Sequence, residues 1–176
     1  MVFEPMRIKT NYLIMSFSAI IIVSIAGFVI TFSFLENTNT QTPPIIPPVS
    51  EIEVDAYGNV YYIVDGDTYD QNGISGIGDR VRLADVDSPE SYEAGYQEAK
   101  DWLYDTIYGK NVYLDIDDIY GTDCYDRWVG VVYIRYNSTH CLNVNYALVL
   151  SGNAVIDNYY NEFNPYSWKL YYYHPI

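Results

Sequence analysis

Residues 59–68 read Asn-Val-Tyr-Tyr-Ile-Val-Asp-Gly-Asp-Thr, and this stretch decides the fold class. Its first six residues are rich in β-formers, and the Asp65-Gly66 pair that follows is a turn signal, so the stretch predicts a β-hairpin. Residues 80–84, Arg-Val-Arg-Leu-Ala, predict the next strand, which ends near the Asp-Ser-Pro of residues 87–89. The domain therefore begins with antiparallel strands.

Residues 92–108 predict an amphipathic helix, because apolar and small side chains recur at spacings of three and four and Gly109 stands where helices commonly stop. The recurring residues are Ala99, Trp102, Leu103, Thr106 and Ile107. Further strands are predicted at residues 111–116 and 128–136, and a second helix at residues 143–150 with Gly152 as its C-cap. After residue 156 the pattern fades, so we expect an irregular tail packed by its aromatic side chains. This order of elements predicts a small α+β domain built on a barrel.

The composition restricts the classes of function. Asp and Glu outnumber Lys and Arg by 23 to 9, which gives a net charge of −14 over 176 residues. A broad basic surface for nucleic acid is therefore not expected, although a small cationic site in an acidic body is compatible with this charge. The two cysteines form no CxxC pair, so a structural zinc site is unsupported.

The N-terminal part predicts a membrane anchor. Residues 12–35 contain no charged side chain, and as a helix they would span about 36 Å, enough to cross a hydrocarbon core of about 30 Å. A cleaved signal peptide is the alternative, with a shorter apolar region and a small-residue end. Arg7 and Lys9 place residues 1–11 in the cytoplasm and the domain outside the cell, on a single-pass membrane protein or, after cleavage, as a secreted one.

The remaining boundaries follow from composition. Residues 36–50 are rich in Thr, Asn and Pro and include two proline pairs, which predict a semi-rigid linker. Residues 51–176 carry the alternating and helical patterns and form the predicted exported domain.

Acidic residues and arginines gather in three short stretches, residues 64–68, 82–90 and 123–127. Asp67, Asp87 and Glu90 supply carboxylate oxygens, which hard cations such as Ca²⁺ prefer. Arg82 and Arg127 carry guanidinium groups that pair with phosphate oxygens. Taken singly, these stretches suit a turn, a helix start or an exposed arginine; as an ordered set they predict phosphoryl transfer.

The ordered set resembles the thermonuclease (staphylococcal nuclease) family. The resemblance spans about residues 54–156 and rests on five elements in order. They are Asp-Gly-Asp-Thr at 65–68, Arg-Leu to Asp-Ser-Pro-Glu at 82–90, the helix start at 95–99, Asp-x-Tyr-x-Arg at 123–127, and the helix at 142–149 with Gly152 and Ala154.

The resemblance implies a five-stranded OB-like barrel with two to three helices. It implies that Asp67, Asp87 and the Ser88 carbonyl bind Ca²⁺, and that Glu90 positions or deprotonates the attacking water. Its further implications are that Arg82 and Arg127, with Tyr125 beside them, hold the substrate, and that DNA or RNA is cleaved to 3′-phosphate ends.

Several departures from the family pattern concern substrate affinity. Asp126 replaces the family's usual glycine, and we expect it to draw Arg127 into a salt bridge or to bend the loop. Asp85 adds a carboxylate between Arg82 and Asp87, and Ser88 stands where threonine is common.

Three secondary features have two interpretations each. Tyrosine clusters such as Tyr159-Tyr160 suit half-buried barrel and tail positions, or stacking on single-stranded bases. Asn137 begins a glycosylation sequon in a predicted turn, although such triplets also occur by chance. Cys124 and Cys141 flank a predicted hairpin and could form a disulfide outside the cell.

Three functions compete. The first is an active extracellular nuclease, which predicts that the acids and arginines converge on one pocket. The second is a catalytically weak or silent module that binds nucleic acid or protein, and the third is a surface protein that uses an aromatic face. We expect a monomer, and the sequence indicates no protein partner.

Overall fold

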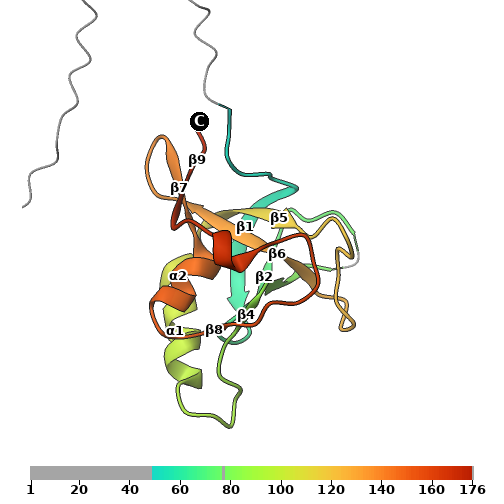
Figure 1. Cartoon of the computed structure of the whole chain (residues 1–176). Helices are drawn as coiled ribbons and strands as arrows, with labels where there is room; N and C mark the ends of the chain where they lie inside the picture. Colours follow the sequence, from blue (N-terminus) through green and yellow to red (C-terminus); the bar gives the residue numbers. More distant parts are fainter. Residues whose placement is uncertain (1–48, 77, 176) are drawn as a thin grey trace, which may run out of the picture. The chain divides into compact units, whose positions relative to one another are not determined.

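The computed structural model describes residues 49–76 and 78–175 (Figure 1). The predictions for residues 1–11 and 12–35, and for all but the last two residues of 36–50, lie outside the described residues. Neither α-helix of the described part is long and apolar enough to cross a membrane. The elements are β1 (Ala56–Ile63), β2 (Thr68–Gln71), β3 (Arg80–Leu83), β4 (Val86–Asp87), α1 (Tyr96–Ile107), β5 (Asn111–Ile116), β6 (Trp128–Arg135), β7 (His140–Asn143), α2 (Val144–Leu150), β8 (Val155–Ile156), a 3-10 helix (Pro165–Ser167) and β9 (Tyr171–Tyr173).

Five of the strands close into a barrel. The sheet runs β3-β2-β1-β5-β6, and β3 pairs in parallel with β6 to complete the circle. In this closing pair Val81 lies opposite Trp128 and Leu83 lies opposite Gly130. A closed barrel has no free strand edge at the seam. The predicted α+β, OB-like barrel with helices is confirmed.

The core fills the barrel interior and continues to the two helices, which pack against the barrel (Figure 1). Helix α1 contributes Ala99, Leu103 and Ile107, the spacing of four that the sequence displayed, and helix α2 contributes Val144 and Leu148. The barrel contributes mainly β-branched and leucine side chains: Val60, Val81, Leu83, Val112, Leu114 and Val132. Inward positions alternate along the strands, as expected for a filled small barrel.

Asn145 fastens helix α2 to the barrel seam. Its side chain is fully buried. The side-chain oxygen accepts the Val132 N–H at 3.0 Å, and the amide nitrogen donates to the carbonyls of Ala84 at 2.9 Å and Gly130 at 3.1 Å. One side chain thereby satisfies buried backbone groups from both sides of the β3–β6 junction.

Two helix boundaries differ in detail from the prediction. Helix α1 begins at Tyr96 rather than near residue 92, because Gly95 at its N-cap takes a left-handed φ of 95°. In α2, the Asn143 side chain caps the helix by accepting the Tyr146 N–H, the C-cap is Ser151, and Gly152 follows it at a φ of 80°. Helices commonly have such a left-handed residue just after the cap, so the C-cap falls one position earlier than predicted.

The expected irregular tail is wrong in part. Its end forms β9, which pairs antiparallel with β7 and extends the sheet beyond the barrel. The tyrosine run 171–173 fits an edge strand, because β-sheets accept aromatic side chains readily. Tyr171 packs against Tyr136, with ring centroids 4.5 Å apart.

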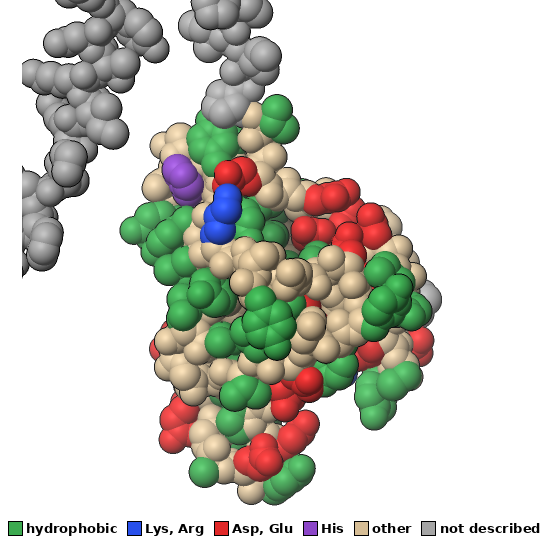
Figure 2. All heavy atoms as spheres, viewed as in Figure 1, with side chains coloured by type: hydrophobic (Ala, Val, Ile, Leu, Met, Phe, Trp, Pro, Cys, Tyr) green, Lys and Arg blue, Asp and Glu red, His purple; other side chains and the backbone are tan. Residues whose placement is uncertain are grey.

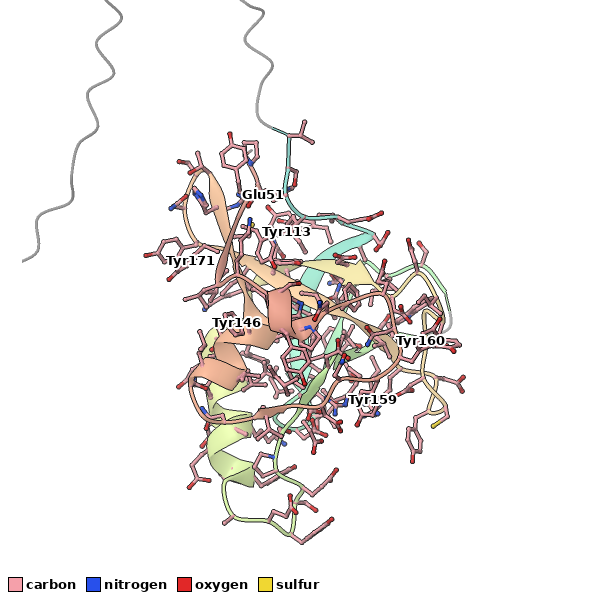
Figure 3. All side chains as sticks on the ribbon, in the orientation of Figure 1. Glu51, Tyr113, Tyr146, Tyr159, Tyr160 and Tyr171 are labelled. Atoms are coloured by element: carbon pink, nitrogen blue, oxygen red, sulfur yellow. The ribbon has the colours of Figure 1, made fainter. Side chains whose placement is uncertain are left out.

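Strand β9 also holds the residues that precede β1. The Glu51 N–H donates to the Tyr173 carbonyl at 2.7 Å, and the Tyr173 N–H donates to the Glu51 carboxylate at 2.9 Å. The Lys169 ammonium lies 3.2 Å from the same carboxylate, and Ser50 Oγ lies 2.8 Å from His174 Nδ1. We call these contacts the terminal clasp; Glu51 is labelled in Figure 3.

Replacing Asn145 tests the seam. Asn145→Ala leaves the Val132 N–H and the Ala84 carbonyl buried without their side-chain partner, so we expect a loss of about 2–4 kcal/mol in the free energy of unfolding. Urea denaturation measures it. Asn158→Ala, at an exposed position of the same residue type, should change stability by less than about 0.5 kcal/mol. Equal stability of the two variants would contradict the role given to Asn145.

Candidate active site

Asp67 stands at the start of β2, in the turn of the predicted hairpin. The turn forms locally, because the Asp65 carboxylate accepts the Asp67 N–H at 3.1 Å. Gly66 has no room for a side chain: a Cβ there would lie 2.7 Å from both Ala99 Cβ and the Ser88 side chain. The turn is therefore pressed against helix α1 and against residue 88, which brings distant parts of the sequence to Asp67.

The Asp67 carboxylate is buried and joins two loops. Its Oδ2 accepts the Ser88 N–H at 2.8 Å, and its Oδ1 accepts the Thr68 hydroxyl at 3.1 Å. Ser88 follows Asp87, the last residue of β4. The hydrogen bond therefore sets the distance between the Asp65–Thr68 turn and the segment that carries Asp87.

Arg82 connects the two predicted metal-binding carboxylates. It lies on β3 opposite Thr68, and its guanidinium is 3.0 Å from Asp67 Oδ1 and 3.5 Å from Asp87 Oδ1. It also donates to the carbonyls of Leu83 and Val86, at 3.2 and 2.8 Å. These bonds hold the side chain in place, with only 13% of it exposed.

Arg127 contacts Thr68, the residue that lies opposite Arg82 in the β2–β3 pair. It ends the loop before β6, and its guanidinium is 2.7 Å from the Asp123 carboxylate and 3.3 Å from Thr68 Oγ1. The Tyr125 ring lies 5.3 Å from the guanidinium carbon and is itself exposed. Burial raises the pKa of the Asp123 carboxyl, but hydrogen bonds from the Arg127 side chain and loop N–H groups outweigh it and leave that pKa below its usual range.

The two arginines share one pocket of about 470 Å³. Its wall continues from the arginines to the carboxylate of Asp85 and to the rings of Tyr120, Tyr159 and Tyr160. Figure 3 labels Tyr159 and Tyr160 on the segment that follows β8. An anion in this pocket would meet guanidinium groups and aromatic rings in the same wall.

Glu90 lies apart from this cluster. It is exposed three residues after Asp87, and its N–H donates to the Glu93 carboxylate at 2.9 Å. Among the described residues, its own carboxylate makes no ion pair or hydrogen bond with Arg82, Asp67 or Asp87. The structure thus brings Asp67, Arg82, Asp87, Ser88 and Arg127 together and places Glu90 at the edge.

The donor set suits a hard cation only in part. Asp67 and Asp87 both face the Arg82 guanidinium, so two carboxylates already lie close together. Within residues 49–76 and 78–175 no group of three or more His, Cys, Asp or Glu side chains is arranged to hold a metal ion. A Ca²⁺ ion takes six to eight oxygens, so the carbonyl of Ser88 and water would have to complete its shell. The residues therefore fit such an ion as a site of two carboxylates, not as a protein cage.

Asp126 does not bind Arg127. The residue adopts a left-handed φ of 58°, and its N–H donates to the Asp123 carbonyl at 3.1 Å. The arginine pairs with Asp123 instead. The expectation that Asp126 forms the salt bridge is therefore wrong. Asp is among the few residues with a side chain that tolerate the left-handed conformation where the family has glycine.

The two cysteines do not form a disulfide. Cys124 is exposed in the loop before β6, and Cys141 is buried in β7. The Cys141 side chain packs in a small buried cluster with Ile52, Ala84 and Val131. Asn137 is exposed in the turn between β6 and β7, as the sequon requires; its side-chain oxygen accepts the N–H groups of Thr139 and His140.

Sequence reasoning missed two contributors to this site. The motif at residues 123–127 does not by itself predict that Asp123 pairs with Arg127. The two residues stand at the two ends of a tight loop, and that closeness was the available signal. Thr68 was read as a turn residue, yet its hydroxyl lies between Asp67 and Arg127. Its position opposite Arg82 in the predicted strand pair was the available signal.

The fold and this site define an OB-like barrel protein with a pocket that is lined by two arginines and by carboxylates. The chain belongs to the family described as staphylococcal nuclease homologue, whose family model matches residues 80–174. That match begins at β3, and the Asp65–Thr68 turn precedes it.

Curated relatives share about a third of the matched residues. A micrococcal nuclease of Shigella flexneri is 36% identical over 112 residues, which cover 61% of this chain and 62% of the relative. Protein ParB of Escherichia coli is 35% identical over 101 residues, 55% of each chain. An uncharacterized endonuclease of Haemophilus influenzae is 37% identical over 95 residues, 54% of this chain and 49% of the relative. The chain thus spans about half to three fifths of the relatives that it matches.

The left-handed position of Asp126 generates a stability prediction. A side chain without local hydrogen bonding costs about 1–2 kcal/mol in this conformation, whereas glycine adopts it freely. We therefore expect the free energy of unfolding of Asp126→Ala, measured by urea denaturation, to be about 1 kcal/mol lower than that of Asp126→Gly. Asp126→Asn should be close to the wild type. An alanine variant as stable as the glycine variant would show that residue 126 is not held at positive φ.

Proposed function

We propose that the protein is a calcium-dependent phosphodiesterase that hydrolyses DNA, RNA or both to 3′-phosphate ends. The observation that carries this proposal is the convergence of Arg82 and Arg127 on the adjacent residues Asp67 and Thr68. Both arginines line one pocket, and the carboxylates of Asp67 and Asp87 contact the Arg82 guanidinium. Family membership and the nuclease names of two relatives support the same reading.

Each residue has a proposed task. Arg82 and Arg127 bind the scissile phosphate and stabilise the negative charge that grows on it during attack. Asp67, Asp87 and the Ser88 carbonyl would hold Ca²⁺, which would polarise the phosphate and the attacking water. Glu90 positions or deprotonates that water. Water attacks phosphorus, the 5′ P–O bond breaks, and the products are a 3′-phosphate and a 5′-hydroxyl.

The remaining surface argues for weak binding outside the site. On the face shown in Figure 2, Asp and Glu side chains gather in several places and Lys and Arg side chains at one. Arg80 and Lys169, away from the pocket, are already paired with Asp70 and Glu51. The substrate is therefore held at the pocket, by the two arginines and by stacking of unpaired bases on the exposed rings of Tyr159 and Tyr160.

Single substitutions test the assignment. The purified full-length protein should degrade single-stranded DNA, double-stranded DNA or RNA in Ca²⁺ and not in EGTA. Arg127→Ala and Glu90→Gln should each reduce kcat/KM by at least about 100-fold, because each removes a transition-state interaction. Arg80→Ala and Glu98→Gln are matched controls at exposed positions and should stay within about threefold of wild type. Gel analysis with end-group mass spectrometry identifies 3′-phosphate products.

The same assay separates the competing functions. A folded wild-type protein that binds oligonucleotides but never cleaves them would support the silent binding module. Cleavage that survives in EGTA would overturn the calcium requirement. The role of the arginines would still be tested by Arg127→Ala.

We also propose that the catalytic domain acts outside the cell, tethered by residues 12–35. The charge-free run and the preceding Arg7 and Lys9 support this. In intact cells, a membrane-impermeant maleimide should label exposed Cys124, and Cys124→Ser should abolish the labelling because Cys141 is buried. Labelling that requires permeabilised cells would place the domain inside.

A further inference from the structure

We propose that Asp85 is a positioning residue that fixes residues 157–161, and through them the rings of Tyr159 and Tyr160, as the aromatic wall of the substrate pocket. The inference rests on the proposed nuclease function and names a residue that shapes substrate affinity. The motif comparison left Asp85 as an extra carboxylate between Arg82 and Asp87 without a task.

Three hydrogen bonds join Asp85 to the segment after β8. Its carbonyl accepts the Asp157 N–H at 3.1 Å. Its Oδ1 accepts the Tyr159 N–H at 3.0 Å and the Asn161 side-chain amide at 2.7 Å. One residue therefore holds the segment at three successive odd-numbered positions and leaves Tyr160 to project between them.

The segment itself has little burial to hold it. Tyr159 is 56% exposed and Tyr160 is 78% exposed. The Tyr160 ring meets only Tyr120 among the described aromatic pairs, at 6.1 Å and edge to face. Hydrogen bonds to a rigid partner therefore matter more here than apolar packing.

Asp85 is such a rigid partner. It is 1% exposed and adopts a left-handed φ of 55° in the turn between β3 and β4. It follows Ala84, whose carbonyl is held by Asn145. Arg82 precedes this turn and Asp87 follows it. The turn therefore fixes the aromatic wall relative to the Arg82 side of the pocket.

Burying the Asp85 carboxylate costs free energy, which favours a specific role for it. Its Oδ2 has no hydrogen-bond partner among the described residues, and its Oδ1 makes both side-chain hydrogen bonds to the segment. A residue kept only for the turn could be glycine or asparagine at the same φ. The acceptor at Oδ1 is what glycine would lack.

Two substitutions separate the acceptor from the backbone conformation. Asp85→Gly keeps the left-handed turn and removes the acceptor, whereas Asp85→Asn keeps both. On single-stranded oligonucleotides we expect Asp85→Gly to raise KM about tenfold, since stacking is worth roughly 1–3 kcal/mol per base, with kcat within about threefold. Asp85→Asn should restore KM to within about threefold of wild type.

A double-mutant cycle shows whether Asp85 acts through the tyrosines. In a Tyr159→Ala/Tyr160→Ala background, which itself raises KM, Asp85→Gly should have no further effect. Additive effects would overturn the proposal. So would a fall in kcat at unchanged KM, because that would place Asp85 in the chemistry rather than in the pocket wall.

Amide hydrogen exchange gives a readout that does not need activity. In the full-length protein, exchange at residues 157–161 should accelerate in Asp85→Gly and not in Asp85→Asn, with circular dichroism confirming that both are folded. Unchanged exchange in the glycine variant would overturn the positioning role. If the wild type fails to cleave any substrate, the proposed function fails, and the exchange result still decides whether Asp85 holds the segment.

Discussion

Asn145 joins the parts of the domain that meet where the barrel closes. Its side chain satisfies the backbone of β6 and the first residue after β3 at once. The chain leaves this junction through Asp85, whose left-handed conformation turns it into β4. Arg82 precedes the turn and Asp87 follows it, so the positions of both site residues depend on the same buried amide. The parallel pairing of β3 with β6 in turn brings the loop that carries Arg127 to the same rim.

The site is an arrangement of opposed charges within an acidic protein. Arg82 lies between two carboxylates, and Arg127 lies against a third. These pairs hold long side chains in defined orientations, which is what transition-state stabilisation needs. They also neutralise much of the positive charge. The attraction that a phosphate experiences therefore depends on what else Asp67 and Asp87 bind, and a nearby aromatic wall would supply affinity that net charge does not.

Local patterns predicted most of the fold and only part of the site. The hairpin, the strands near residues 80, 111 and 128 and both helices were predictable, because periodicity and turn residues act within a few positions. Strand β9 was not, since an edge strand of three tyrosines gains its structure from β7, far away in sequence. The family motif named the candidate metal ligands and arginines, and the structure places Asp67 and Asp87 beside Arg82. The pairing of Arg127 with Asp123 and the exposed place of Glu90 depend on loop geometry that no pattern encodes.

The terminal clasp has a mechanical consequence. Glu51 and Tyr173 are bonded through two backbone N–H groups, and Lys169 pairs with the same glutamate. A pull on the chain at residue 50 would load these contacts before the tension reached β1, the first strand of the closed barrel. The β3–β6 seam and the site residues beside it would not be loaded until these contacts had broken. The clasp can thus yield under tension and close again while the arginines stay in register.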